Sequence, residues 1–341
     1  MTNNFENEDF VPKLTVVGCG GQGCNLINRL YTQGIKSATT VALNTDAKHL
    51  SIVSAHQKLL IGKQLTRGLG AGGFPEIGMK AADASRDEIR KAVTGNNIVF
   101  IAAGMGGGTG GGSAPVVAEI AREEGALVVA FVTYPFALER SRKKKADWSI
   151  DQLSKQADTT VIIENDRLLS YAPNLPMEKA FDLIDSIASN AVRGIADTIT
   201  MPSLINLDYA DVRTIMGNAG TAMINIGHGS GPDKVEKAIK STVSHPLLDV
   251  ELDGAKSALV HVTGGNALTI SEATSVGAGV TAGLADNANV IFGSRLDDAF
   301  RDQIRVMSIV TGVKPKFGTA SNLIRADAAQ DASFVSGLEM L

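Results

Sequence analysis

Short apolar runs recur along the first half of this 341-residue chain. They are Leu14–Val17, Thr40–Leu43, Leu59–Ile61, Ile98–Ile101, Leu127–Thr133 and Thr160–Ile163. The segments between them have apolar residues at helical spacing, most clearly over Asn25–Leu30, Ile77–Val93 and Pro115–Glu124. Nearly continuous apolar strands that alternate with amphipathic helices predict an α/β fold, with a parallel sheet covered by helices on both faces.

A long helix and a second, smaller α/β unit are predicted to follow. From Met177 to Thr200 apolar residues recur at three- or four-residue steps and form one stripe, between Pro176 and Pro202. Strand-like runs then occur at Ser257–Val262, Asn289–Phe292 and Ile304–Thr311, and the periodicity is lost from about Gly318.

Two glycine-rich loops join predicted strands to predicted helices. Gly18–Gly23 fits GxGxxG, a pattern that lets backbone N–H groups approach a pyrophosphate at a helix N-terminus. With Asp46 further along, this loop alone would also fit an NAD-dependent oxidoreductase. Gly104–Ser113 contains seven glycines within Gly104–Gly112, which we interpret as backbone folded closely around a ligand, before a helix that begins near Ser113 and Pro115.

The number of glycine loops favours a nucleoside triphosphate over a dinucleotide. A third loop, Gly68–Gly73, is also glycine-rich, whereas a dehydrogenase needs only one such loop. No lysine follows the glycines of the second loop, so it is not the GxxxxGK[ST] loop of P-loop enzymes. In a parallel sheet of this kind, ligands bind outside the carboxyl ends of the strands, where these loops lie.

Composition narrows the possible partners and location. The net charge is -4 and 20% of residues are charged, so no large basic surface for nucleic acid is expected. The two cysteines, Cys19 and Cys24, have neither disulfide nor zinc spacing. The N-terminus lacks the apolar core of a signal peptide, and the longest apolar stretch, Ala126–Val132, is too short to span a bilayer. A cytoplasmic protein is expected.

The second loop, GMGGGTGGGSAP, resembles the signature loop of the tubulin and FtsZ superfamily. Five further motifs occur along the chain in the order of that family and resemble its FtsZ branch: Asn44–Asp46, Gly70–Gly72, Thr133–Phe136, Asn165–Asp166 and Asn206–Asp211. The resemblance extends over Leu14–Lys316, and His261–Val262 is similar to archaeal members. It implies an N-terminal arm (1–12), a GTP-binding domain (13–175), a central helix (176–201), a C-terminal activation domain (202–317) and a tail (318–341).

The resemblance implies a site for GTP or GDP, with Mg²⁺ held through the phosphates and no metal ligand assigned among the side chains. It places guanine between Phe181 and Asn165 with Asp185 at the base edge, and Glu139 at the ribose. Either Arg142 or Lys143 is the basic contact. The full set of expected GTP-binding residues is Gly20, Gly21, Gln22, Asn25, Asn44, Asp46, Ala71, Gly72, Gly104, Gly106, Gly107, Gly108, Thr109, Gly110, Pro135, Glu139, Arg142, Lys143, Asn165, Phe181 and Asp185.

Three polar residues after the long helix have two interpretations. Asn206, Asp208 and Asp211 precede or begin a predicted helix, where acids commonly cap the first turn. The resemblance instead implies that this loop enters the nucleotide pocket of the next subunit and that the acids are catalytic. Subunits would then assemble head to tail, and GTP would be hydrolysed where they meet.

The function expected from the resemblance is that of a polymerising GTPase that forms or patterns the cell-division ring, at the division site. A tubulin-like role in cell shape or an accessory division step is the alternative, and a protein that binds GTP without turnover is disfavoured by the acid pair. The sequence ends in an apolar cluster, and Gly337, Leu338, Glu339, Met340 and Leu341 are expected to bind a membrane-tethering adaptor.

Overall fold

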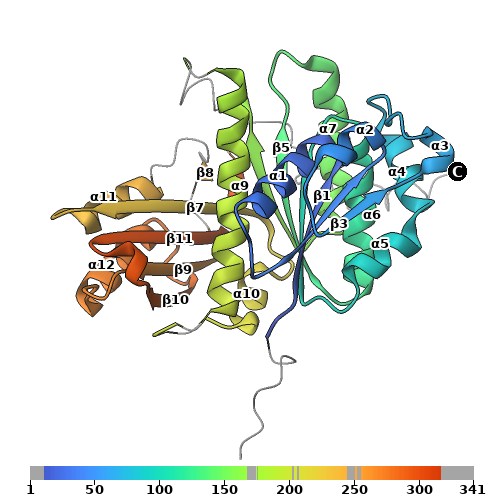
Figure 1. The fold of residues 1–341 in the computed structure, drawn as a ribbon. Coiled ribbons are helices and arrows are strands. Elements are labelled where there is room, and N and C mark those ends of the chain that lie inside the picture. Colours follow the sequence, from blue (N-terminus) through green and yellow to red (C-terminus); the bar gives the residue numbers. More distant parts are fainter. Residues whose placement is uncertain are drawn as a thin grey trace, which may run out of the picture.

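The computed structural model describes residues 11–166, 174, 176–201, 203–205, 207–243, 250–251 and 255–315. Its main sheet has ten strands in the order β10-β9-β11-β7-β6-β5-β4-β1-β2-β3 (Figure 1). The first six strands pair in parallel throughout, as predicted. They are β1 (Leu14–Cys19), β2 (Thr39–Asn44), β3 (Gln57–Leu60), β4 (Ile98–Gly104), β5 (Leu127–Tyr134) and β6 (Thr159–Glu164).

Helices cover both faces of this parallel sheet. Neighbouring strand residues such as Val16 and Val17 point into different cores, as the two-residue period of a strand requires. One core includes side chains of α1 (Gly20–Thr32), α2 (Ala47–Ile52), α9 (Met177–Thr200) and α10 (Tyr209–Met216). The other includes those of α4 (Pro75–Asp83), α5 (Arg86–Val93), α6 (Thr109–Glu123) and α7 (Arg140–Ser154). A short helix, α3 (Lys63–Thr66), precedes α4.

Two helix predictions need correction. The predicted segment Ile77–Val93 is two helices, because Ser85 leaves the helical conformation and its hydroxyl accepts a hydrogen bond from the backbone N–H of Gly62 at 3.1 Å. Helix α6 begins at Thr109 rather than near Ser113 and Pro115, so the last three glycines of the second loop are helical and Pro115 lies inside the helix.

The second half of the chain extends the same sheet. Strand β7 (Gly220–Ser230) pairs in parallel with β6 at two residues and antiparallel with β11 (Gln303–Thr311). Strand β11 also pairs antiparallel with β9 (Ser257–Gly264), and β10 (Asn289–Leu296) pairs with β9 and forms the edge of the sheet. Helices α11 (Lys234–Val243) and α12 (Ile270–Thr281) pack on it, with a 3-10 turn, η2 (Asp298–Phe300). A two-stranded sheet contains β8 (Val250–Glu251) and β12 (Lys314–Pro315).

Strand β7 and helices α11 and α12 were not predicted. The strand contains three glycines, which weaken a strand pattern, but two of them allow α11 to lie close to it. A Cβ at Gly229 would be 1.8 Å from the carbonyl oxygen of Lys234, and one at Gly227 would be 2.0 Å from Thr242 Oγ1. The long helix α9 has the predicted bounds and stands between the two halves of the sheet (Figure 1). The domain limits given above stay a prediction.

Candidate functional site

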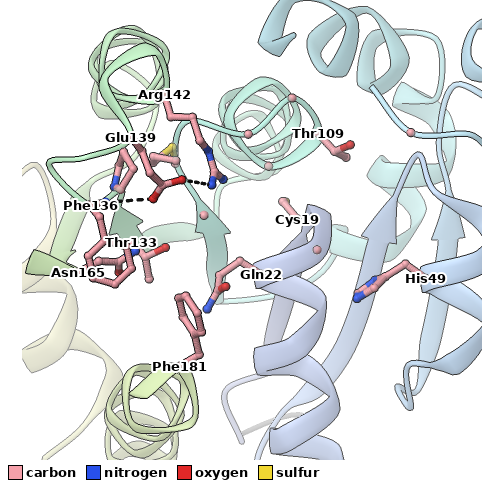
Figure 2. Close-up of a pocket in the computed structure, with 18 of the residues that line it drawn as sticks. Cys19, Gln22, His49, Thr109, Thr133, Phe136, Glu139, Arg142, Asn165 and Phe181 are labelled. Carbon is pink, nitrogen blue, oxygen red and sulfur yellow. Dashed lines mark hydrogen bonds and ion pairs between the residues drawn. The ribbon is translucent and has the colours of Figure 1, made fainter. Parts of the chain in front are cut away.

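A cavity of about 890 Å³ lies at the carboxyl ends of the parallel strands (Figure 2). It is bounded by the turn between β1 and α1, the loop between β4 and α6, the loop between β5 and α7, and the first turn of α9. Its volume is within the range of roughly 300–1,000 Å³ that is usual for small-molecule sites. Three segments predicted to surround a nucleotide, the loops at Gly18–Gly23, Gly68–Gly73 and Gly104–Gly112, all contribute residues to it.

The N-termini of α1 and α6 form one wall of the cavity. Gly20 and Gly106 have φ of 71° and 87°, a left-handed conformation that favours glycine and turns the chain from each strand into its helix. No atom lies within 4 Å of the position that a Cβ would occupy at Gly21, and the nearest to that of Gly107 is 3.9 Å away. At these two positions a ligand can approach the backbone, and helix N-termini attract anions.

Other glycines of the second loop serve helix packing. A Cβ at Gly112 would be 2.0 Å from the carbonyl oxygen of Pro75 and 2.5 Å from the backbone nitrogen of Met79. One at Gly111 would be 2.4 Å from Ser149 Oγ. Our interpretation of all seven glycines as ligand-facing is therefore wrong for these two: they let α6 pack directly against α4 and α7.

The wall beside β2 is held by short polar side chains. Thr109 Oγ1 and Thr45 Oγ1 are 2.6 Å apart, so the first residue of α6 is tied to the end of β2. Asn44 Oδ1 accepts from the backbone N–H groups of Thr45 and Asp46, and Asp46 caps α2 by accepting from the N–H of His49 at 3.0 Å. His49 also lines the cavity; the only sign of this in the sequence is its place three residues after Asp46.

The loop before α7 supplies an ion pair. Glu139 is the N-cap of α7 and its carboxylate is paired with the guanidinium of Arg142, while Glu139 Oε1 also accepts from the N–H of Phe136 at 3.1 Å. Both charged side chains reach the cavity, as Figure 2 shows. Lys143 does not line it; its ammonium group lies 5.5 Å from the centre of the Tyr134 ring.

The other end of the cavity is aromatic and amide-lined. Phe181 projects from α9 and meets Phe136 edge to face, with ring centroids 6.2 Å apart. Asn165, which follows β6, is 8% exposed, and its Oδ1 has no hydrogen-bond partner. A flat ligand group between Phe181 and Asn165 would meet a ring face and an unpaired buried acceptor.

Asp185 lies one turn after Phe181 and just behind Gln22. Gln22 Nε2 donates to Asp185 Oδ1 at 2.8 Å, and Gln22 and Phe181 are shared with an adjoining cavity of about 730 Å³, which Asp185 and Asn25 line. Burial raises the pKa of Asp185 to about 7, although the Gln22 hydrogen bond and the charge of Arg29 act to lower it. At neutral pH this carboxyl group is therefore close to half ionised, and a ligand that donates hydrogen bonds to it would favour the ionised form.

Asp208 and Asp211 form a reciprocal cap at the start of α10. Asp208 Oδ1 accepts from the N–H of Asp211 at 2.9 Å, and Asp211 Oδ2 accepts from the N–H of Asp208 at 3.0 Å. Each carboxylate keeps its other oxygen for a further partner. Helix α10, which the pair caps, lies near the C-terminal end of α9 (Figure 1), whereas Ala180 and Phe181 near the N-terminal end of α9 line the cavity. Asn206 lies outside the described residues.

The cavity brings together two thirds of the expected nucleotide-binding residues. Those that line it are Gly21, Gln22, Asn44, Asp46, Gly104, Gly107, Gly108, Thr109, Gly110, Pro135, Glu139, Arg142, Asn165 and Phe181. Those that do not are Gly20, Asn25, Ala71, Gly72, Gly106, Lys143 and Asp185; of these, Asn25 and Asp185 line the adjoining cavity. The cavity is also lined by residues that were not named as site residues: Cys19, His49, Gly70, Met105, Thr133, Phe136, Leu138 and Ala180. His49 is in α2, Ala180 in α9 and Gly70 in the third glycine loop, and the others lie at strand ends or in the loops that follow them.

The described residues contain no group of three or more His, Cys, Asp or Glu side chains arranged to hold a metal ion. Within the same residues, no helix has both the length and the apolar character needed to cross a membrane. Burial raises the pKa of both Cys19 and Cys24 to about 12, so neither thiol is ionised at neutral pH.

Comparison with known proteins identifies the class. Residues 13–173 match the GTPase domain of the tubulin/FtsZ family, and residues 220–314 match the C-terminal domain of the FtsZ family. The chain is 51% identical over 316 residues to cell division protein FtsZ 2 of Methanocaldococcus jannaschii, which covers 92% of this chain and 83% of the relative. It is 49% identical over 302 residues to cell division protein FtsZ 1 of Archaeoglobus fulgidus, covering 88% and 82%.

Solved structures agree with this class. An FtsZ dimer of M. jannaschii superposes with a TM-score of 0.84 at 47% identity, covering 89% of each chain. CetZ2 of Haloferax volcanii, a GTPγS-bound protofilament, superposes with a TM-score of 0.77 at 22% identity and shows the fold alone. The fold is that of a tubulin-like protein with a GTPase domain. At about half identity over nine-tenths of its length, the chain belongs to the FtsZ family, in its archaeal type, and the NAD-dependent oxidoreductase alternative is wrong.

Proposed function

We propose that GTP occupies the cavity with its phosphates at the N-termini of α1 and α6 and its guanine between Phe181 and Asn165. The open backbone at Gly21 and Gly107 and the positive ends of both helices support the phosphate end. The unpaired Asn165 Oδ1 and the exposed face of Phe181 support the base end. Arg142, paired with Glu139, is the better candidate than Lys143 for the basic contact, because it lines the cavity.

Guanine fits the acid at this end better than adenine does. Guanine presents N1–H and N2–H₂, two donors that one carboxylate can accept side by side, whereas adenine presents an acceptor at N1. Asp185 accepts a hydrogen bond from Gln22, so Gln22 must release or share this carboxylate when guanine binds to it. Mg²⁺ would be held mainly by the phosphates, and the Thr109 hydroxyl lines the cavity at the N-terminus of α6.

The observation that carries the mechanism is the separation of the acids from the cavity. Helix α9 has 24 residues, so its ends are about 36 Å apart at 1.5 Å per residue. Phe181 is in its first turns, and Asp208 and Asp211 come after its end. One chain therefore cannot place these acids on its own nucleotide, but a second copy stacked head to tail can. The two carboxylates would orient and polarise the attacking water, while the helix termini stabilise charge on the phosphates.

Such an interface joins different surfaces of the two copies and so propagates as a filament. Exposed apolar side chains occur near both ends: Leu69 and Leu138 beside the cavity, 84% and 78% exposed, and Leu204 just before α10, 70% exposed. As an FtsZ-family protein the chain is a GTPase that forms polymers in cell division. We place it at the division site rather than in a cell-shape role, because its relatives at about half identity are named cell division proteins.

Sedimentation with GTP, with GDP and without nucleotide, combined with phosphate release on the same samples, tests this function. Pelleting and phosphate release that both require GTP are expected. Phosphate release without any pelleted polymer would contradict the shared site, and neither activity with any nucleotide would contradict the proposal as a whole.

We also propose, from the sequence alone, that residues 337–341 recruit a membrane-tethering adaptor; they lie outside the described residues. Deleting the last eight residues should leave GTP turnover and polymer formation intact and abolish recruitment to adaptor-bearing membranes. Loss of folding or assembly in the truncated protein would contradict this.

A further inference from the structure

A second cavity of about 90 Å³ lies between α9 and the sheet of the second half of the chain. Helix α9 contributes Asn190, Arg193, Gly194, Asp197 and Thr198, which have the spacing of one helix face. This face is opposite the apolar stripe that packs on the parallel sheet. A Cβ at Gly194 would be 2.6 Å from the sulfur of Met307, so glycine lets the helix approach the sheet closely at this point.

Basic side chains cross the opposing sheet in register. Arg295 of β10 is paired with Thr263 of β9, Thr263 with Arg305 of β11, and Arg305 with His228 of β7. All four line the cavity, as does His261 from the adjacent row of β9. Side chains in such a row point to the same face of a sheet, so two guanidinium groups from the sheet face the Arg193 guanidinium of the helix.

The cavity has more positive than negative charge among the described residues. Arg193, Arg295 and Arg305 are opposed by the carboxylates of Asp197 and Asp297. Burial, followed by the charges of Arg295 and Arg305, lowers the pKa of His261 to about 4, so this imidazole is neutral at neutral pH. Burial and the charge of Arg295 also lower the pKa of Arg305. These groups carry one more positive charge than negative; Arg193 also donates to the Gln33 carbonyl at 3.1 Å, and the Arg305 guanidinium lies 4.9 Å from the centre of the Phe300 ring.

Two buried donors of this cluster have no hydrogen-bond partner. Arg295 is 7% exposed and its Nε is unpaired; one terminal nitrogen meets only the Met201 sulfur, a weak acceptor, at 2.8 Å. The other terminal nitrogen donates to Asp297 at 3.1 Å. His261 is 4% exposed and its Nε2 is also unpaired. Leaving such groups unpaired costs free energy, more so when one is charged.

We propose that this cavity binds one small oxyanion, inorganic phosphate being the ligand chemistry that fits, between Arg295, Arg305, Arg193 and His261. Guanidinium groups match oxyanions in geometry as well as in charge, and the Nε2–H tautomer of His261 adds a donor. The space exceeds that of a single water, whose share of liquid volume is about 30 Å³, and excludes a nucleotide. Asp197 and Asp297 restrict occupancy to one small anion. Because the contacts come from α9 and from the sheet, the bound anion holds these two parts together.

The test uses the full chain loaded with GDP, so that the nucleotide cavity cannot take up the added anion. The melting temperature is measured against phosphate concentration, with sodium gluconate keeping the ionic strength constant. A specific site gives a saturable rise, whereas the general stabilising effect of phosphate grows without saturation. Arg305→Gln should lose the saturable part. Lys240→Gln, the same charge change on an exposed residue of α11, should keep it. Equal saturable rises in Arg305→Gln and the parent, or no saturable rise in the parent, would overturn the proposal.

A second measurement does not depend on a variant that folds. Crystals of the GDP-loaded protein soaked in selenate should show an anomalous peak between Arg295 and Arg305. A bromide soak is the comparison: a peak at this position with bromide as well would indicate a general anion site rather than an oxyanion site. A saturating selenate soak with no peak at this position would overturn the proposal, whatever happens in the nucleotide cavity, because the proposed GTP site makes no use of these residues.

Discussion

Replacing Asp211 with asparagine should separate its chemistry from its structural role. Its Oδ2 accepts the 3.0 Å bond from the N–H of Asp208 that closes the cap of α10. An asparagine amide oxygen can accept the same bond but carries no charge. We expect Asp211→Asn to change the free energy of unfolding by less than about 0.5 kcal/mol. Asp211→Ala removes the bond and should lose about 1 kcal/mol.

Both substitutions should slow hydrolysis alike. A carboxylate that polarises the attacking water contributes roughly 10²–10⁴-fold to the rate, or about 3–5 kcal/mol of the barrier. Both variants should therefore bind GTP and form pelletable polymers, yet release phosphate at least roughly 10²-fold more slowly. Phosphate release is measured on the pelleted fraction, and stability by urea denaturation. Asp87→Asn, which neutralises an exposed first-turn acid of α5, is the matched control and should hydrolyse GTP normally.

Two results would refute this reasoning. Parental turnover by Asp211→Asn polymers would mean that the charge has no part in hydrolysis. A defect in Asp211→Ala that Asp211→Asn does not share would mean that the residue acts only by holding α10 in place.

Three other substitutions test the nucleotide cavity. Asp185→Ala should weaken GTP binding by about 1.5–3 kcal/mol and reduce the preference for GTP over ATP. Burial raises the pKa of Asp185 to about 7, and guanine favours its ionised form, so the GTP affinity of the parent protein should fall as the pH drops below about 7 and level off above it. The affinity of the variant should not depend on pH in this way. Unchanged discrimination by titration calorimetry would contradict the role. Thr109→Ala should lose nucleotide affinity while Thr109→Ser keeps it, since the hydroxyl bonded to Thr45 is retained; equal affinities would contradict this. Gly112→Ala forces a Cβ to 2.0 Å from the Pro75 carbonyl oxygen and should cost at least about 1–3 kcal/mol in urea denaturation, whereas an unchanged midpoint would show that α6 and α4 are not in close contact.

The parallel sheet and the long helix could be predicted because their apolar residues follow a local period. Leu14–Val17 and Ile98–Ile101 are buried on both faces, so the run of apolar residues itself identifies the strand. Strand β7 could not be predicted this way, because Gly227 and Gly229 are there to accommodate α11, which is a tertiary constraint. The start of α6 was missed for a similar reason: glycines disfavour helices locally, and the close packing of α6 on α4 and α7 explains Gly111 and Gly112.

The candidate site, like the fold, could be predicted only in part from the sequence. Glycine loops at strand ends identify the cavity, since parallel strands bring their carboxyl ends to one edge. The choice of Arg142 over Lys143 depends on which face of α7 turns inward, and the position of Asp185 behind Gln22 depends on how α9 packs on α1. Neither follows from spacing. The charged cavity beside α9 could not be predicted from the sequence. Strand register brings Arg295 and Arg305 to the same row of the sheet, and the packing of α9 on this sheet adds Arg193.

The dependence of GTP turnover on protein concentration tests the shared site most directly. Turnover per subunit is measured by phosphate release over a dilution series, and polymer by sedimentation of the same samples. Since Asp208 and Asp211 are about the length of α9 away from the cavity of their own chain, turnover per subunit should be negligible below a threshold, and should rise steeply at the concentration where polymer first pellets. Turnover per subunit that stays constant through that threshold would contradict the account, because it would show that a single chain completes its own active site.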